Sequence, residues 1–168
     1  MRVRFRCNGT DADVVTADGE SLLSVLRERL GLVSVKDGCA PQGQCGCCTV
    51  LVDGEPVLSC LLPVANVAGR SVSTLEGMGG ADPLQRAFHE RFAVQCGFCA
   101  PGMLMAARAL LDRNPSPTRD EIAEALVGNV CRCTGYESII DAIATCAAGP
   151  PPSASDREAG HLAEIRRS

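Results

Sequence analysis

The chain has 168 residues, a net charge of −4, one tyrosine, four phenylalanines and no tryptophan. This length is enough for one medium domain or two small ones, and the acidic balance gives no indication of a nucleic-acid partner. No signal peptide and no apolar run of membrane-spanning length is evident. We therefore expect a cytoplasmic protein, in which disulfides are disfavoured and clustered thiols indicate metal or redox chemistry.

The first part of the chain predicts strands around one helix. Apolar residues alternate with three arginines at the start, and Asn8-Gly9 follows, which is a strong hairpin signal. The expected elements are a strand over residues 2–7, a helix over about 21–30, a hairpin over 49–57 and a strand over 71–74. Residues 36–48, rich in Gly and Cys, are expected to form an irregular loop. This pattern is typical of a small α+β domain that ends near Gly77.

The following part predicts four short helices with brief connections. The first begins at Asp82-Pro83, and the second covers about 102–112. The third begins after Thr118, whose capping-box partner is Glu121, and the fourth covers about 136–145. The expected apolar stripe of the first of them is Leu84, Ala87, Phe88 and Phe92. Four helices in so short a stretch indicate a compact helical bundle. A Pro-rich segment follows, and we expect a disordered tail there.

Four cysteines in the first part have the spacing of a plant-type iron–sulfur site. They are Cys39, Cys45, Cys48 and Cys60, and their pattern is C-x5-C-x2-C-x11-C. Three lie on one Gly-rich loop and the fourth follows a hairpin, which is close to C-x4-C-x2-C with a distant fourth cysteine. Zinc sites use two tight pairs more often. A zinc loop and inert buried cysteines are the alternatives, and we favour a [2Fe–2S] cluster.

A second set lies in the helical part and comprises Cys96, Cys99, Cys131 and Cys133. We expect loops at the ends of two helices to bring this C-x2-C pair and C-x-C pair together. From spacing alone, structural zinc competes with a second cluster. The C-x-C pair is less usual for zinc, and a second redox centre close to the first has an evident use.

Three cysteines stand outside the two sets. Cys48 is chosen over its neighbour Cys47 because it keeps the C-x2-C spacing with Cys45, and Cys47 is expected to point away from the cluster. Cys7 lies on the apolar face of the first strand, and Cys146 continues an apolar helix face. Both are expected to be small core residues.

Two long motifs, in this order, resemble the iron–sulfur subunit of the molybdenum hydroxylase family, which includes the xanthine dehydrogenase, aldehyde oxidoreductase and carbon monoxide dehydrogenase types. The resembling segments are 37–39, 44–54, 59–60, 95–102 and 128–136, and the resemblance covers roughly residues 1–147. The first loop departs from the family pattern, because five residues rather than four separate its first two cysteines. Cys47 also stands where alanine is commoner.

The resemblance implies an α+β fold with a β-grasp, plant-type ferredoxin-like domain over residues 1–77 and a four-helix bundle over 78–147. Residues 148–168 would form the tail. Each domain would bind one [2Fe–2S] cluster through its cysteine set. Gln95 matches a residue that hydrogen-bonds the molybdopterin cofactor of a partner subunit, and Cys133 matches the cluster ligand nearest to that cofactor.

The resemblance also implies partners. The chain would be the electron-transfer subunit of a hetero-oligomer, of which a dimer of heterotrimers is one arrangement. A large subunit would bind molybdopterin, and a medium subunit would bind FAD. Hydroxylation of an aldehyde or an N-heterocycle would take place on the large subunit, so no catalytic residue is expected in this chain. A free-standing ferredoxin-like carrier and a zinc-binding interaction module are the alternatives.

Overall fold

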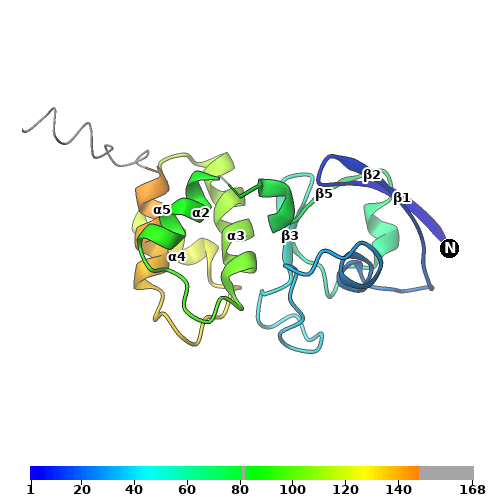
Figure 1. Cartoon of the computed structure of the whole chain (residues 1–168), viewed down its shortest axis with the longest axis horizontal. Coiled ribbons are helices and arrows are strands. Elements are labelled where there is room, and N and C mark those ends of the chain that lie inside the picture. The colour runs from blue at the N-terminus through cyan, green and yellow to red at the C-terminus, as the bar shows by residue number, and fades with distance from the viewer. Residues whose placement is uncertain (81, 148–168) are drawn as a thin grey trace, which may run out of the picture.

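The computed structural model describes residues 1–80 and 82–147. Figure 1 shows an elongated arrangement in which the strands gather at the N-terminal end and helices α2 to α5 at the other. The expected tail over residues 148–168 lies outside the described residues. Within the described part, no helix is long and apolar enough to cross a membrane.

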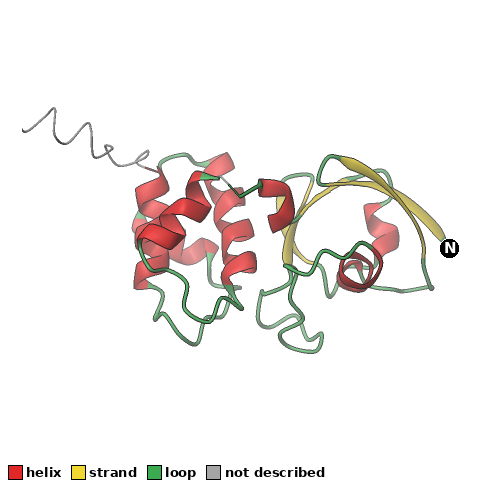
Figure 2. Cartoon of the chain, in the orientation of Figure 1, coloured by secondary structure: helices red, strands yellow, loops and turns green. Residues whose placement is uncertain are grey.

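Five strands form one mixed sheet in the N-terminal part, in the order β2-β1-β5-β3-β4. Figure 2 shows the strands, in yellow, gathered in this part of the chain. They are β1 Arg2–Cys7, β2 Thr10–Val15, β3 Thr49–Val52, β4 Glu55–Leu58 and β5 Ser71–Ser73. Only the β1–β5 pair is parallel. Asn8 and Gly9 have φ of 51° and 81°, as a two-residue hairpin turn of the primed type requires. The predicted strands and hairpins are confirmed.

The first helix is present but differs in type from the prediction. A short α-helical turn, α1 Leu22–Ser24, continues as a π-helical turn over Val25–Arg29. The amide of Leu30 accordingly donates to the carbonyl of Val25, five residues earlier, at 3.1 Å. Gly31 follows with a φ of 69°, the left-handed conformation expected after a helix.

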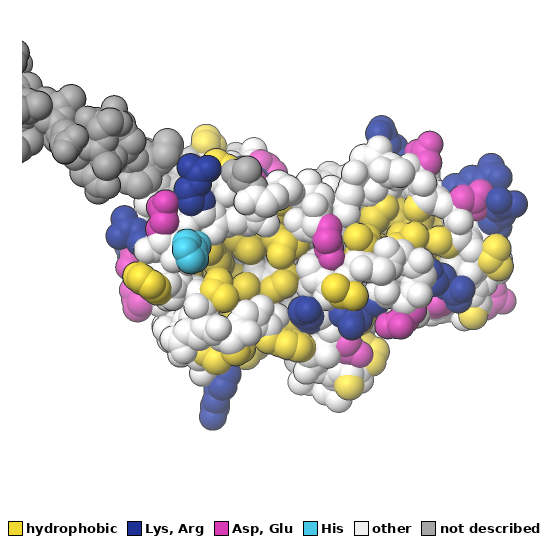
Figure 3. Space-filling model, in the orientation of Figure 1, with side chains coloured by type: hydrophobic (Ala, Val, Ile, Leu, Met, Phe, Trp, Pro, Cys, Tyr) yellow, Lys and Arg dark blue, Asp and Glu magenta, His cyan; other side chains and the backbone are white. Residues whose placement is uncertain are grey.

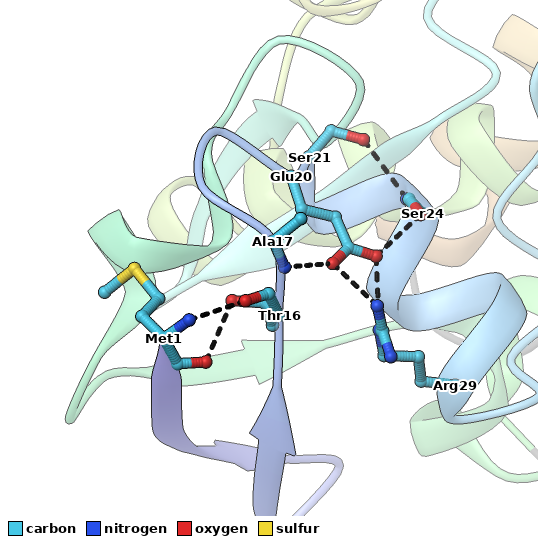
Figure 4. A network of polar contacts seen from close by, with 7 residues as sticks. All are labelled: Met1, Thr16, Ala17, Glu20, Ser21, Ser24 and Arg29. Atoms are coloured by element: carbon cyan, nitrogen blue, oxygen red, sulfur yellow. Dashed lines mark hydrogen bonds and ion pairs between the residues drawn. The ribbon is translucent and has the colours of Figure 1, made fainter.

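A polar network fastens the start of α1 to the end of the first hairpin (Figure 4). The carboxylate of Glu20 accepts hydrogen bonds from the Ala17 amide at 3.0 Å and from the Arg29 guanidinium at 2.9 Å. Arg29, followed by the Ala17 amide, lowers the pKa of Glu20 to about 2. The Met1 ammonium donates to the carbonyl of Thr16 at 2.6 Å. The network therefore joins the N-terminus, the loop and the helix.

Four helices form the second part, as predicted from their caps and apolar spacing. They are α2 Pro83–Glu90, α3 Ala100–Arg113, α4 Arg119–Ala125 and α5 Glu137–Ala147. Asp82 caps α2 by accepting from the Leu84 amide at 2.8 Å. Thr118 and Glu121 form the predicted capping box of α4, with both reciprocal hydrogen bonds present. The apolar side chains of these helices form a core separate from that of the sheet.

Phe92 does not belong to the buried stripe of α2, so this prediction is wrong. The helix ends at Glu90, and the side chain of Phe92 is 82 % exposed. The amide of Ala93 donates to the carbonyl of Phe88 at 2.9 Å, which is the six-to-one bond of a Schellman turn. This turn places Phe92 in the left-handed conformation, with a φ of 53°, and directs the ring away from the core.

Replacing Phe92 with glycine is expected to raise the free energy of unfolding by about 1 kcal/mol, because a Cβ at positive φ is strained and the exposed ring buries little. Thermal unfolding of the cluster-loaded chain measures the change. The Phe92→Ala variant is the control, since it removes the same ring but keeps the Cβ. Equal stability of the two variants would show that backbone strain is not the cause.

Helix α3 lies against strand β3, and this contact joins the two parts. Leu51 of β3 packs with Met105 and Ala109 of α3 in a small cluster of buried residues. At the end of α3, Arg113 forms an ion pair with Glu55 at 3.0 Å. The N-terminus of α3 consequently faces the loop that precedes β3, where the first cysteine set lies.

Candidate metal centres

The first cysteine set lies on the loop before β3 and on the turn after β4. Cys48 and Cys60 are buried, and Cys39 and Cys45 are half-buried. The thiol of Cys39 contacts that of Cys45, and the thiol of Cys48 contacts that of Cys60. The structure therefore brings together all four residues predicted from spacing, as two pairs of thiols.

The loop presents backbone amides to Cys39. The Gln42 amide lies 3.3 Å from its Sγ, and the amides of Gln44, Gln42 and Cys45 together lower the pKa of the Cys39 thiol to about 6. Gly43, with a φ of 68°, lets the loop fold back over the sulfur. This environment favours a thiolate, which is the form that binds iron.

Cys60 lies in the opposite environment. Burial, followed by the neighbouring Cys48 thiol, raises the pKa of Cys60 to about 12. Because only a thiolate ligates metal, metal binding at this pair has to displace a proton, and the positive charge of the metal favours that loss.

The second cysteine set also forms two pairs. The Sγ atoms of Cys96 and Cys133 lie 3.6 Å apart, and both residues are exposed. Cys99 contacts Cys131 deeper in the helical part. A small pocket between the two loops is lined by all four cysteines and by Gln95, which is exposed. The structure thus groups the four predicted residues and places Gln95 at their solvent-facing edge.

Hydrogen bonds again favour the thiolate at one member of this set. Burial acts to raise the pKa of Cys131, but the hydroxyl of Thr134 at 3.1 Å and its amide at 3.5 Å lower it to about 7. Burial raises the pKa of Cys99, the other member of the pair, to about 12. Each set therefore combines a thiol whose pKa is lowered with a buried thiol whose pKa is raised.

The pairing tests whether the residues fit an iron–sulfur cluster. Within each set the four predicted thiols include two contacting pairs, and a [2Fe–2S] cluster takes two cysteines at each of its two irons. The donor sets therefore fit the predicted clusters.

Cys47 is a further neighbour of the first set, because its thiol contacts that of Cys45. It is 4 % exposed, and its Sγ lies 3.7 Å from the carbonyl oxygen of Cys45. Burial raises the pKa of this thiol to about 12. Cys7 is buried in the core of the sheet, as predicted. Cys146 is half-buried and packs against the core of the helices.

Two hydrogen bonds that the sequence did not predict connect the cysteine loops. The amide of Val130 donates to the carbonyl of Cys45 at 2.9 Å, and the side chain of Asn129 donates to the carbonyl of Gly46 at 2.9 Å. They link segments more than eighty residues apart in the chain. The residues near each loop in the sequence do not indicate this contact, because the contact depends on how the two parts of the chain pack together.

Comparison with known families assigns each part of the chain to an iron–sulfur domain. Residues 5–68 match the family described as 2Fe-2S iron-sulfur cluster binding domain. Residues 74–144 match the family described as [2Fe-2S] binding domain. Each matched range contains one of the two cysteine sets.

Full-length relatives and a solved structure agree with this assignment. The chain is 46% identical to the nicotinate dehydrogenase small FeS subunit of Eubacterium barkeri, over 85% of this chain and 92% of the relative. It is 44% identical to the xanthine dehydrogenase iron-sulfur-binding subunit of Escherichia coli O157:H7, over 87% and 94%. A chain of quinoline 2-oxidoreductase from Pseudomonas putida 86 superposes with a TM-score of 0.83 at 45% identity, covering 88% of this chain and 92% of that one.

Proposed function

Because the chain belongs to the family of small iron–sulfur subunits of molybdenum hydroxylases, we propose that it relays electrons from a molybdenum–pterin site on a large subunit to an FAD subunit or another acceptor. Two [2Fe–2S] clusters, when bound, supply two one-electron redox centres. The observation that carries this proposal is the pair of four-thiol sites, one loop of each being hydrogen-bonded to the other.

The ligand assignment follows from the thiol pairs. We assign Cys39, Cys45, Cys48 and Cys60 to the first cluster and Cys96, Cys99, Cys131 and Cys133 to the second. What supports it is the two-by-two pairing, together with the amides and hydroxyl aimed at Cys39 and Cys131. Such donors stabilise negative charge on sulfur, and they also influence the reduction potential of a bound cluster.

We infer a β-grasp ferredoxin-like domain over residues 1–77 and a four-helix bundle over 78–147. The mixed five-stranded sheet with α1, and the separate apolar core of α2 to α5, support this division. Both domains are required by the proposal, because each holds one of the two sites.

The partner of the second site is the large molybdopterin-binding subunit. Cys96, Cys133 and Gln95 are exposed at the same pocket, so this edge is open to a docked cofactor. Val94, which lines the pocket, is 42% exposed, and Phe98 on the same loop is 45% exposed; exposed apolar side chains of this kind favour a protein contact. Apolar side chains also gather over the helical part on the face shown in Figure 3. We propose that this edge receives electrons from the molybdenum site.

The remaining partners are also part of the proposal. We infer a medium FAD-binding subunit as the acceptor and a hetero-oligomeric complex, with a dimer of heterotrimers as one such assembly, in the cytoplasm. The named relatives that match over nearly their whole length are subunits, which favours this arrangement over a free-standing carrier. Nicotinate, xanthine and quinoline, the compounds in the relatives' names, are N-heterocycles, which supports hydroxylation of an N-heterocycle by the complex.

Replacing Gln95 with alanine tests the entry point. We expect both clusters to remain, and their reduction by substrate in the assembled complex to slow about tenfold, the equivalent of one lost hydrogen bond. Anaerobic stopped-flow bleaching of the iron–sulfur absorbance measures this rate. The matched control is Asn66→Ala, which removes another exposed amide side chain at a position in the sheet domain that belongs to neither cysteine set. Reduction of the Gln95→Ala complex at the wild-type rate would remove Gln95 from the electron path.

A further inference from the structure

Asn129 is a buried polar residue at the junction of the two cysteine loops. It is 5 % exposed. Its Nδ2 donates to the carbonyl of Gly46 at 2.9 Å and contacts the hydroxyl of Thr49 at 3.4 Å. Gly46 lies between Cys45 and Cys48 of the first set, and a single residue separates Asn129 from the C-x-C pair of the second. Its side chain therefore spans from one cluster site to the other.

Hydrogen bonds also fix the backbone on either side of Asn129. The amide of Val130 donates to the carbonyl of Cys45 at 2.9 Å. The hydroxyl of Tyr136 donates to the carbonyl of Asn129 at 3.1 Å and accepts from the amide of Cys131 at 2.9 Å. Asn129 is thus fixed to the first site by its side chain and to the second site by its own backbone.

The two cysteine loops and the start of α3 are closely packed around the side chain of Asn129. A Cβ added to Gly46 would stand 2.6 Å from Nδ2 of Asn129 and would collide with the carbonyl of Gly128. A Cβ on Gly102, at the start of α3, would stand 3.0 Å from the same nitrogen. Two glycines and one amide side chain therefore define how closely the two sites approach each other.

We propose that Asn129 is a positioning residue that sets the spacing of the two [2Fe–2S] sites and thereby the rate of electron exchange between them. This inference rests on the proposed function. The exchange moves one electron from one site to the other and needs no proton or co-reactant. Because electron tunnelling weakens steeply with distance, a small loosening of the loops slows the exchange while both ligand sets stay complete.

The test uses the Asn129→Asp variant, which keeps the shape of the side chain but replaces the donating amide with a carboxylate facing the Gly46 carbonyl. Asn129→Ser is the second variant, because its shorter side chain removes the contact without adding charge. Asn66→Asp, at an exposed asparagine of the sheet domain, is the matched control. Iron content, the EPR spectrum of the fully reduced chain and the intersite exchange rate after rapid partial reduction are measured for each.

We expect both Asn129 variants to keep full iron content. The magnetic interaction between their two reduced centres should weaken, and the exchange rate should fall about tenfold, while the control stays at wild-type values. An unchanged interaction and exchange rate would overturn the inference. Loss of iron in both variants, with wild-type coupling in the clusters that remain, would also overturn it and make Asn129 a residue of folding alone.

The wild-type spectrum separates this inference from the proposed function. Two coupled signals in the wild type, unaltered in the variants, would reject only the role of Asn129. A single signal in the wild type would reject the two-cluster relay itself, whatever the variants do.

Discussion

The Cys48→Ser variant is expected to hold two irons per chain where the wild type holds four, whereas Cys47→Ser keeps all four. Cys48 and Cys60 are 2 % and 7 % exposed, and their thiols contact each other. A serine at position 48 leaves this pair with one thiolate, so the first cluster is lost. The second set lies on other loops and should keep its iron.

The Cys47→Ser variant is the matched control, because it makes the same change one residue away. The Sγ of Cys47 lies 3.7 Å from the Cys45 carbonyl, and its thiol contacts that of Cys45, so this variant directly tests whether Cys47 competes with Cys48 for the ligand position. Iron and sulfide analysis with the visible absorbance spectrum distinguishes the two variants. Equal iron loss in both would show that the adjacent cysteines share the ligand position and that the assignment of Cys48 is wrong.

The Gly102→Ala variant is expected to lower the free energy of unfolding by about 1–3 kcal/mol, the usual effect of overpacking a tight contact. Gly102 is buried in the first turn of α3. A Cβ there would collide with the carbonyl of Gly46 and stand 3.1 Å from the Cα of Cys47. Both neighbours are backbone atoms of the first cysteine loop, so relief requires the two parts of the chain to move apart.

The matched control for this substitution is Gly128→Ala. A Cβ on Gly128 meets no atom within 4 Å, so this variant should unfold close to the wild-type temperature. Thermal unfolding of the cluster-loaded chain compares the two. Helix propensity alone favours alanine over glycine by about 1 kcal/mol at an interior helical position. A Gly102→Ala variant more stable than the wild type would therefore contradict the close contact between the loops.

Most of the fold could be predicted because its signals are local. The Asn8-Gly9 turn, the Asp82 cap and the Thr118–Glu121 capping box each depend on residues within a few positions, and all are present. The prediction that Phe92 is buried is wrong because its spacing continues the apolar stripe of α2. The Schellman turn that ends this helix has phenylalanine, not the usual glycine, at its left-handed position, so the sequence does not indicate the turn. The π-helical turn over Val25–Arg29 has no sequence signal of this kind either.

In the candidate sites, too, features that depend on nearby residues were predictable and contacts between distant segments were not. The spacing of the cysteines was enough to group them into two sets, and the structure brings the members of each set into contact. The contact between the sets was not predictable. The sequence around Asn129 is typical of a loop and does not indicate a contact with Gly46, which lies in the other part of the chain. Only the packing of α3 against β3 brings them together.

The central claim is that the chain holds two [2Fe–2S] clusters that relay electrons. Low-temperature EPR of the dithionite-reduced protein, with iron, sulfide and zinc counts on the same sample, tests it most directly. We predict two distinct S = 1/2 signals and four irons per chain, one cluster for each cysteine set. One signal with two irons, and zinc in the remaining set, would contradict the relay and leave a ferredoxin domain joined to a structural zinc site.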